Sequence, residues 1–328
     1  ANVTSSSYTV PSTVRRIASY SFIYSDLLKA IELPNGLEVI EEGAFAHCKN
    51  LISIDIPASV NEIGSNFLRG TLALKSVKVD ENNTHYASKE GVLFNKNMEK
   101  LIYHPTNADE ISYTFPESVT EVENYAFRGS KKLETIVPSR LLKKIGRGSF
   151  DDCDMLDNIE FFDALESIAS SAFSGSDTLT HITFGRAVKT VDKYAFHPCR
   201  NLKKISMKTE NPPSAASDAF YGVVSCTLEV PIGCKEAYQN APEWSSFQNI
   251  VEVDYSGIGD LSINDNINIS YHNYVLVFSS DKESSFELYN LSGQRLLNKR
   301  IIGSISIYVE PGAYIIKTGK KTKKIILR

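Results

Sequence analysis

The chain has 328 residues, of which 42% are hydrophobic and 23% are charged, and its formal net charge is −4. These values are typical of a folded protein with a sizeable core, and they exclude a disordered chain and a strongly basic nucleic-acid binder. No apolar run reaches the roughly 18 residues that a membrane-spanning helix needs, and residues 1–7 lack the pattern of a signal peptide.

Phenylalanines recur at a nearly constant spacing through the first two thirds of the chain. The aligned set is Phe22, Phe45, Phe67, Phe127, Phe150, Phe173, Phe196 and Phe220, with spacings of 23, 22, 60, 23, 23, 23 and 24 residues. A run of the type Leu-x-x-Ile-x-Ile follows most of them, as in Leu51–Ile56. A period near 23 with this run is typical of leucine-rich repeats. We therefore expect a mainly β leucine-rich repeat solenoid of about eight repeats of about 23 residues each.

Within one repeat, apolar and polar residues alternate. Ile54 and Ile56 alternate with Ser53 and Asp55, which is the period of a half-buried strand. A single repeat cannot bury its own apolar side and needs neighbours above and below. The phenylalanines are therefore expected to form a buried ladder of stacked rings.

The gap of 60 residues predicts an insertion at about residues 80–116. Two short apolar runs, Gly91–Phe94 and Lys100–Tyr103, flank a turn at Asn95–Asn97, and this pattern predicts a β-hairpin. Two interpretations stay open. The hairpin either clamps a ligand or extends the sheet by one irregular turn.

The solenoid is expected to span residues 1–254 and to end in a cap at about 231–254. A short helix is predicted at Glu236–Asn240, and Trp244 near Phe247 is expected to close the open end of the core, because an uncovered last turn would be a sticky edge. From Tyr255 onward the charge changes sign, with ten Lys and Arg against six Asp and Glu. We therefore expect a linker at 255–262 and a second domain at 263–328.

Residues 263–328 contain short alternating strands, such as Tyr274–Phe278 and Ser285–Tyr289, and turn signals such as Ser292–Gly293 and Pro311–Gly312. This pattern predicts a small all-β sandwich.

Two strings carry a family resemblance. Residues 33–51 and 191–202 resemble the BspA-like leucine-rich repeat, with its core of Ala-Phe-x-x-Cys-x-x-Leu. The resemblance covers roughly residues 8–254. It implies an exported bacterial surface protein that adheres to host proteins.

The tail carries a second resemblance. The segments Leu288–Arg295, Pro311–Lys317 and Thr322–Arg328 are similar to the C-terminal sorting domain of the type IX (Por) secretion system. This resemblance implies recognition by an outer-membrane export machinery. The alternative is a passive β-sandwich module.

The sequence shows no motif of catalysis or cofactor binding. It contains no Cys-x-x-Cys, Gly-x-Ser-x-Gly or phosphate-loop string. The five cysteines do not predict a disulfide framework. The one acidic cluster, Asp151–Asp154, lacks the glycine and terminal glutamate of a calcium loop and is expected to be a solvated turn. We expect no enzyme, no cofactor and no metal.

Outward positions on the predicted strand face form a candidate interaction surface. They are Lys75, Lys78, Glu134, Asp157, Glu160, His181 and Lys203. Their charge changes sign between neighbouring repeats, so a nucleic-acid partner is not expected, and opposite charges on adjacent turns also stabilise the ladder. For a glycan, the candidate is an aromatic platform of Tyr86, Phe94 and Tyr103.

Taken together, these patterns favour a non-catalytic, exported bacterial surface protein. It is expected to be secreted or attached to the outer membrane, with its signal peptide outside this chain. Its expected role is protein–protein interaction, specifically adhesion to proteins of a host or a neighbouring cell, such as extracellular matrix. A glycan-binding component of a surface complex and a structural spacer are the alternatives.

Overall fold

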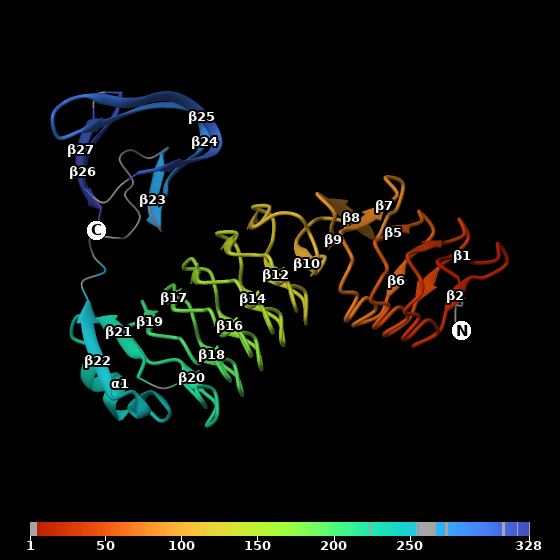
Figure 1. Ribbon diagram of the computed structural model, residues 1–328. Helices are drawn as coiled ribbons and strands as arrows, with labels where there is room; N and C mark the ends of the chain where they lie inside the picture. Colours follow the sequence, from red (N-terminus) through yellow and green to blue (C-terminus); the bar gives the residue numbers. More distant parts are fainter. Residues whose placement is uncertain are drawn as a thin grey trace. The chain divides into compact units, whose positions relative to one another are not determined.

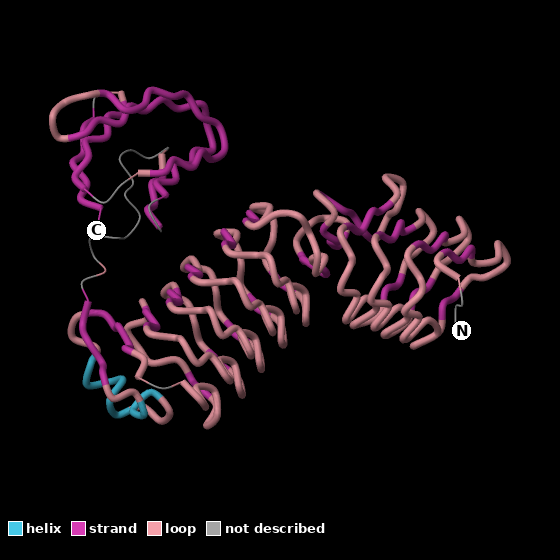
Figure 2. The backbone as a smooth tube through the Cα atoms, in the orientation of Figure 1, coloured by secondary structure: helices cyan, strands magenta, loops and turns pink. Residues whose placement is uncertain are grey.

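In the computed structural model, which describes residues 5–223, 225–253, 255, 267–272, 275–309, 312–319 and 321–327, the chain divides into two units, Ala1–Val253 and Asp254–Arg328. The first unit is a β-solenoid of about 11 turns. The second is an antiparallel sheet. The chain is only 3% helical, and Figure 2 shows helix only at the end of the first unit.

Each regular turn of the solenoid supplies one longer strand and one strand of two residues (Figure 1). The longer strands stack in parallel and form the strand face: β1 (Ser7–Thr9), β3 (Ala30–Glu32), β5 (Ser53–Ile56), β7 (Ser76–Val79), β11 (Ser112–Thr114), β13 (Thr135–Val137), β15 (Asn158–Glu160), β17 (His181–Phe184), β19 (Lys204–Met207), β21 (Thr227–Pro231) and β22 (Asn249–Val253). The two-residue strands are β2 (Arg16–Ile17), β4 (Val39–Ile40), β6 (Glu62–Ile63), β12 (Glu121–Val122), β14 (Lys144–Ile145), β16 (Ser167–Ile168), β18 (Thr190–Val191) and β20 (Ser214–Ala215).

The aromatic ladder predicted from the sequence is present. From Phe127 to Phe220 the rings stack with centroid distances of 5.1, 5.3, 5.4 and 5.6 Å. Phe150, Phe173 and Phe196 are fully buried between their neighbours. Burial and ring stacking therefore hold each turn on the next.

A second ladder lies at the cysteine position of the repeat. The thiols of Cys48, Cys153 and Cys199 donate to the phenylalanine carbonyl of the preceding turn at 3.0, 3.2 and 3.0 Å, and the hydroxyl of Ser176 does the same at 2.7 Å. Cysteine and serine interchange here because both are small donors. Burial raises the pKa of the Cys48 thiol to about 11, and all five cysteines are free.

Backbone hydrogen bonds tie the turns together at the phenylalanine corner. The amide of Phe127 donates to the carbonyl of Ser149 in the next turn at 2.8 Å, and the amides two residues before and two residues after Phe127 donate in the same way. The same three bonds recur around Phe22, Phe45 and Phe150. Each of these four corners therefore donates three amide hydrogens to the following turn.

The third repeat corrects the sequence alignment by one residue. The strand register is 23 residues, with Val39 opposite Glu62, so the position after Phe45 in the ladder is Leu68. The bond from the Phe45 amide to the Phe67 carbonyl places Phe67 at the position that holds alanine in most other turns. The alignment on Phe67 is therefore wrong, because a letter match does not distinguish two adjacent apolar residues.

The insertion is a three-stranded antiparallel meander of β8 (Tyr86–Lys89), β9 (Val92–Asn95) and β10 (Lys100–Tyr103). The predicted hairpin is confirmed as β9–β10. Strand β10 pairs in parallel with β12, so the meander extends the sheet. Side chains of β9 enter two separate cores, since Phe94 joins the C-terminal cluster and Leu93 the N-terminal one.

The expected cap is present at the C-terminal end of the solenoid. Helix α1 (Lys235–Asn240) is followed by a short 3₁₀ helix, η1 (Trp244–Ser246). Trp244 is buried, its ring centroid lies 4.8 Å from that of Phe220, and its indole N–H donates to the carbonyl of Pro213 at 2.7 Å. The cap therefore covers the last ring of the ladder.

The second unit is a curled antiparallel sheet in the order β23 (Asn268–His272), β24 (Val275–Asn290), β26 (Gly312–Thr318), β27 (Lys321–Leu327), with β25 (Arg295–Tyr308) paired to β24. Two strands expected from the sequence merge into β24, whose pairing with β25 shifts between Ser280 and Ser284. Except for Tyr255, the predicted linker 255–262 lies outside the described residues, as do Pro311 and Arg328 of the sorting-domain resemblance.

Candidate binding cleft at the break in the solenoid

The predicted strand-face residues lie on the surface, but several of their charges are paired within the sheet. Lys75 forms an ion pair with Asp109 at 2.9 Å, and Glu160 forms one with Lys208 at 2.8 Å between two largely buried side chains. Asp157 accepts a hydrogen bond from the hydroxyl of Thr180. These contacts stabilise the ladder and leave less free charge for a partner.

The remaining predicted positions do not form one patch. Lys78, Glu134 and Lys203 are exposed on different turns, and no ion pair is found for them within the described residues. His181 is half-buried, and burial lowers the pKa of its imidazole. The strand face is thus a mixed polar surface without a central cluster.

The predicted aromatic platform does not form. Phe94 is fully buried and Tyr103 is 8% exposed, so the expectation that these two rings face a glycan is wrong. Alternating β9 and β10 side chains fill the two cores instead. Tyr86 is half-buried, and its hydroxyl accepts a hydrogen bond from the amide of Ile63 at 2.9 Å.

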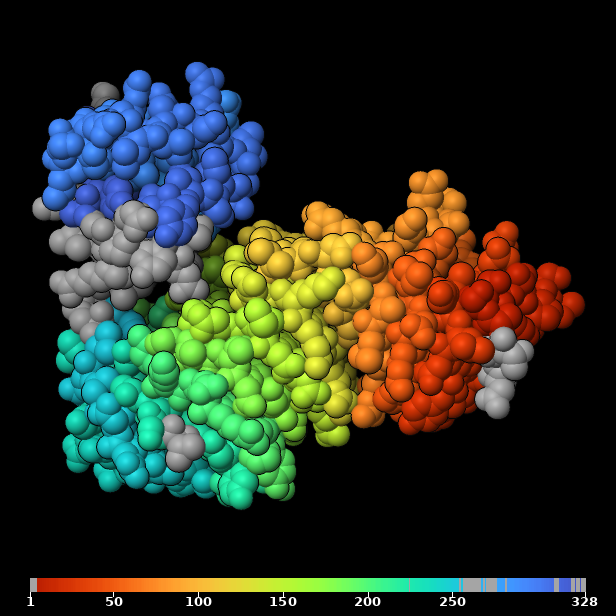
Figure 3. All heavy atoms as spheres, viewed as in Figure 1, coloured from red at the N-terminus to blue at the C-terminus, as the bar shows by residue number. Residues whose placement is uncertain are grey.

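A large hollow in the described surface lies where the two halves of the solenoid meet. It has a volume of about 660 Å³, within the usual range of ligand pockets. One wall is the corner of the third turn at residues 61–72, the other is the corner at 123–131, and the floor is the meander with Tyr86 and Ile102. In Figure 3 the orange and yellow segments that carry these parts meet directly. We call this hollow the break cleft.

The break cleft exists because the meander does not supply a regular corner. In the third turn the amides of Asn66, Leu68 and Gly70 occupy the donor positions, yet no hydrogen bond from them is found among the described residues. On the opposite wall the amide of His104 donates to Ala126 at 2.7 Å. The two other acceptor positions of this corner are the carbonyls of Asn124 and Arg128, and neither accepts a hydrogen bond from the described chain. The ladder is therefore interrupted on both walls.

The position of Phe67 follows from the same interruption. In regular turns this position holds a small residue such as alanine, because the corner of the next turn packs closely against it. Phe67 has room for a larger side chain, because the cleft lies where the next corner would be. The ring turns toward Tyr103 at a centroid distance of 6.0 Å. The hydroxyl of Tyr103 donates to the carbonyl of Leu68 at 3.1 Å, and burial raises its pKa to about 12. These contacts fix the apolar base of the third turn.

Cations outnumber carboxylates around the break cleft. The lining includes Lys49, Arg69, Lys100, Arg128 and Lys131 but only Glu123 and Asp152. Lys131 pairs with Asp154 at 3.2 Å, and Arg128 pairs with Asp151 at 2.9 Å. For Lys49 and Arg69, which are exposed, no ion pair is found within the described part of the chain.

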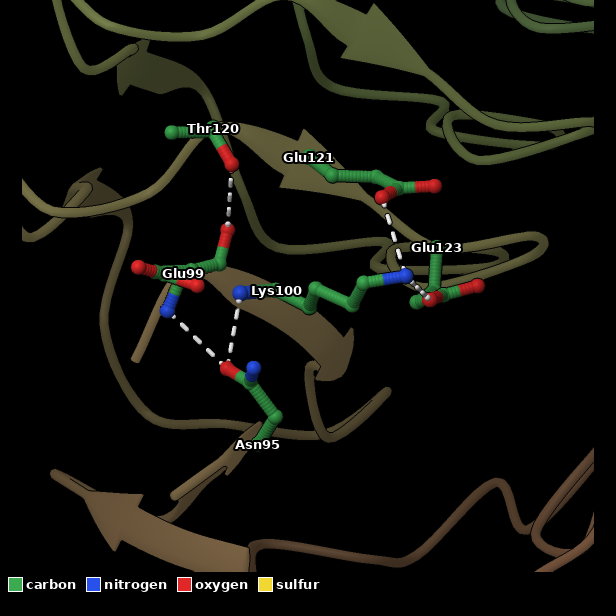
Figure 4. A network of polar contacts seen from close by, with 6 residues as sticks. All are labelled: Asn95, Glu99, Lys100, Thr120, Glu121 and Glu123. Atoms are coloured by element: carbon green, nitrogen blue, oxygen red, sulfur yellow. Dashed lines mark hydrogen bonds and ion pairs between the residues drawn. The ribbon is translucent and has the colours of Figure 1, made fainter. Parts of the chain in front are cut away.

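Figure 4 shows how Lys100 is held. The ammonium of Lys100 lies 3.0 Å from a carboxylate oxygen of Glu121 and 3.3 Å from one of Glu123. The side-chain oxygen of Asn95 accepts from the amides of Glu99 and Lys100, each at 2.9 Å, and so closes the β9–β10 turn. Lys100 is thus neutralised, which leaves Lys49 and Arg69 as the free cations.

One further polar atom in the cleft lacks a partner. The side-chain oxygen of Asn66 is buried and makes no hydrogen bond within the described residues, although Asn66 lines the cleft. Sequence reasoning did not find this site. The only signal was the irregular repeat, a spacing of 22 and then of 60 residues, which marked the place but not its chemistry.

Comparison with known proteins places the solenoid in a family. The sequence profile of the BspA type leucine rich repeat region matches in six copies, over residues 1–114 and 96–227. The chain belongs to this family. A comparison with curated protein sequences finds no match. In this chain one BspA-type repeat forms one turn of the solenoid, and its corner amides donate hydrogen bonds to carbonyls of the next turn.

Solved structures share the fold of this BspA-type chain. The pneumococcal vaccine antigen PcpA is 26% identical, with a TM-score of 0.58 over 76% of this chain and 68% of that one. A leucine rich cell surface protein from Faecalibacterium prausnitzii is 25% identical, with a TM-score of 0.59 over 75% of this chain and 59% of that one. The match therefore spans less than two thirds of the second protein. A leucine-rich repeat protein from Eubacterium ventriosum, 23% identical with a TM-score of 0.54 over 69% and 72% of the two chains, shares the fold.

Among the described residues, no helix is long and apolar enough to cross a membrane. Within the same residues, no group of three or more His, Cys, Asp and Glu side chains is arranged to hold a metal ion.

Proposed function

We propose that this BspA-type chain is a non-catalytic protein-interaction module of a bacterial surface, and that its partner protein binds at the break cleft. The observation that carries this proposal is the interrupted corner ladder, which leaves backbone donors and two unpaired cations, Lys49 and Arg69, in one hollow. Two structural relatives with 25–26% identity support the setting, since one is named a vaccine antigen and the other a cell surface protein.

The chemistry of the break cleft favours binding over catalysis. A catalytic site needs a nucleophile or an acid–base pair within hydrogen-bond reach of one reacting atom. Two histidines line the cleft. His47 is stacked flat against Tyr24 with ring centroids 5.0 Å apart, and burial is the main cause that lowers its pKa. The ring of His85 is hydrogen-bonded to the hydroxyl of Thr84 at 3.0 Å. The carboxylate of Glu123 is paired with Lys100. These side chains are therefore engaged in ring packing, hydrogen bonds and ion pairs, and they do not form an acid–base pair around one reacting atom.

The proposal includes adhesion and export. The partner is a protein of a host or neighbouring cell, with extracellular matrix proteins as the first candidates. The second unit serves as a sorting domain that the export machinery recognises, and the mature protein is secreted or held at the outer membrane. The support for export is the resemblance of segments such as Leu288–Arg295, which form the end of β24, the turn that follows it and the first residue of β25.

Binding of the full chain to immobilised fibronectin, laminin, collagen and fibrinogen would test the proposal, with biolayer interferometry as the readout. Deleting the insertion is unsuitable, because Phe94 and Leu93 are buried in two cores. The variant R69E therefore probes the cleft and K203E, on the strand face, serves as the matched control. We expect saturable binding that R69E weakens and K203E does not. An absence of binding, or equal weakening by both variants, would contradict the proposal.

A glycan partner remains the second candidate, on a different surface from the one expected. Four tyrosines are strongly exposed near the phenylalanine corners: Tyr20, Tyr24, Tyr194 and Tyr221. Tyr221 is 65% exposed, and its ring centroid lies 5.0 Å from that of His197. Exposed ring faces can stack on sugar rings. A glycan array with the full chain, beside the variants Y24A and Y221A, distinguishes this candidate, which requires glycan signals that the variants remove.

A further inference from the structure

We infer that the break cleft binds an extended acidic peptide segment of the partner protein, which takes the place of the missing corner in the hydrogen-bond ladder. This inference rests on the proposed function and names the class of ligand for the same site. In this arrangement, carbonyl groups of the peptide accept from the free amides of the third turn, and its carboxylates contact Lys49 and Arg69.

The first argument is the backbone. In the corners around Phe22, Phe45, Phe127 and Phe150, carbonyls of the next turn accept from the amides two residues before and two residues after the ring, as at Gly43 and His47, whose amides bond to the next turn at 3.1 and 2.6 Å. Asn66 and Gly70 occupy the same two positions, line the cleft and have no acceptor among the described residues. Unpaired edge groups of this kind are satisfied when an added strand or extended segment binds along them.

The second argument is the geometry of Gly70. Its φ is +72°, and a Cβ at this position would lie 2.6 Å from the imidazole of His47. Tyr24, His47 and Asp152, at the same position of regular corners, also have positive φ values of 57°, 58° and 57°. Gly70 therefore keeps the corner conformation in which this amide donates to the next turn, and at Gly70 the cleft takes the place of that turn. The peptide amide groups of a bound segment donate in turn to the free carbonyl of Arg128 on the opposite wall.

The third argument is charge. Lys49 and Arg69 carry no ion pair within the described chain, whereas the cleft carboxylate Glu123 is already neutralised by Lys100. An acidic peptide brings the complementary charge and gains from it in a partly enclosed site. A neutral apolar peptide would leave both cations without a partner. The observations therefore favour acidic side chains next to an extended backbone.

The chain itself supplies a suitable probe. Residues 38–47, Glu-Val-Ile-Glu-Glu-Gly-Ala-Phe-Ala-His, accept the three corner bonds of the first turn through the carbonyls of Glu42, Ala44 and Ala46. As a free fluorescein-labelled peptide, this segment presents the same carbonyl pattern together with three glutamates. The control peptide has lysine in place of Glu38, Glu41 and Glu42 and keeps the rest of the sequence.

Fluorescence polarisation with the full chain measures the affinity for each of the two peptides. We expect the acidic peptide to bind at least about tenfold more tightly than the lysine peptide, and the double variant K49E/R69E to reverse this order. The variant K203E should leave both affinities unchanged. Equal affinities for the two peptides, or no binding of either, would overturn the inference.

Hydrogen exchange separates backbone pairing from simple charge attraction. In the free protein, the amides of residues 64–72 should exchange faster than those of the paired corner 41–49, and the acidic peptide should slow residues 64–72. Binding without this protection would refute the ladder arrangement. Displacement of the peptide by heparin fragments that bind more tightly would also overturn the inference, because the ligand would then be an anionic glycan.

The two proposals fail separately. If matrix proteins bind and R69E has no effect, the peptide site is wrong, whereas protein binding by another surface stands. If the acidic peptide binds as expected and the matrix panel is silent, the cleft chemistry stands and the adhesion partner is wrong.

Discussion

Replacing Phe173 by alanine would remove the central ring of the C-terminal ladder. The ring is fully buried, with centroids 5.3 Å from Phe150 and 5.4 Å from Phe196. A buried Phe→Ala change costs about 3–5 kcal/mol, and an aromatic pair adds about 0.5–1.5 kcal/mol beyond its area. Because both neighbours are rings and a rigid stack cannot collapse into the gap, we expect the free energy of unfolding to fall by about 5 kcal/mol.

Urea unfolding followed by the fluorescence of Trp244 would measure this loss. At an m-value of about 2.5 kcal/mol per molar urea, the midpoint should fall by about 2 M. Circular dichroism should be recorded as well, since a repeat protein can unfold in parts.

The matched control is F67A, at the alanine position beside the cleft. Phe67 has a single ring partner and faces a hollow that water can enter, so we expect a loss of only about 2 kcal/mol. Equal losses for the two variants would refute the reasoning that the ladder is continuous at Phe173 and interrupted at Phe67.

Three further predictions follow from single residues. Replacing Cys153 by serine should keep stability within about 1 kcal/mol, whereas valine should lower it more because the donor is lost; equal thermal melting shifts would contradict this. A thiol reagent should modify only Cys234 quickly in the folded protein, since the other four thiols are buried; rapid labelling of more than one thiol would contradict the burial. The carboxyl of Glu110 has a lowered pKa, mainly through the imidazole of His104, whose Nε2 lies 3.7 Å from the carboxylate. Its contribution to stability should therefore be present above the unfolded pKa of about 4.3 and vanish as the pH falls. The variant E110Q should flatten this acid loss in melting experiments, and an unchanged slope would contradict it.

The sequence predicted the elements whose residues differ in kind from their surroundings. The repeated phenylalanines predicted the ring ladder, and the isolated Trp244 predicted the cap. The turn Asn95–Asn97 between two apolar runs predicted the hairpin. In each case a local pattern determines the structure, because only one arrangement of the chain both buries these residues and stacks the turns.

The break cleft was not predictable in this way. Phe67 and Leu68 are both apolar, and only the path of the backbone decides which of them enters the ladder. The free amide of Gly70 depends on where the insertion leaves the solenoid, which no residue type encodes. In the second unit, the polar run from Ser280 to Ser284 resembles a turn but is an irregularity within one strand.

The regular register also determines how the length of this chain can change. Most neighbouring strands pair at an offset of 23 residues, as between Thr135 and Asn158 or between Lys204 and Thr227, while Thr190 pairs with Ser214 at an offset of 24. A loop between strands can therefore take up one extra residue, whereas losing a single residue within a strand would turn its inward side chains out of the core. Removing or duplicating one whole period rejoins each donor with an equivalent acceptor. Length variation in such a solenoid is therefore expected in whole turns, in the loops between strands, and in the meander, whose antiparallel strands pair with one another.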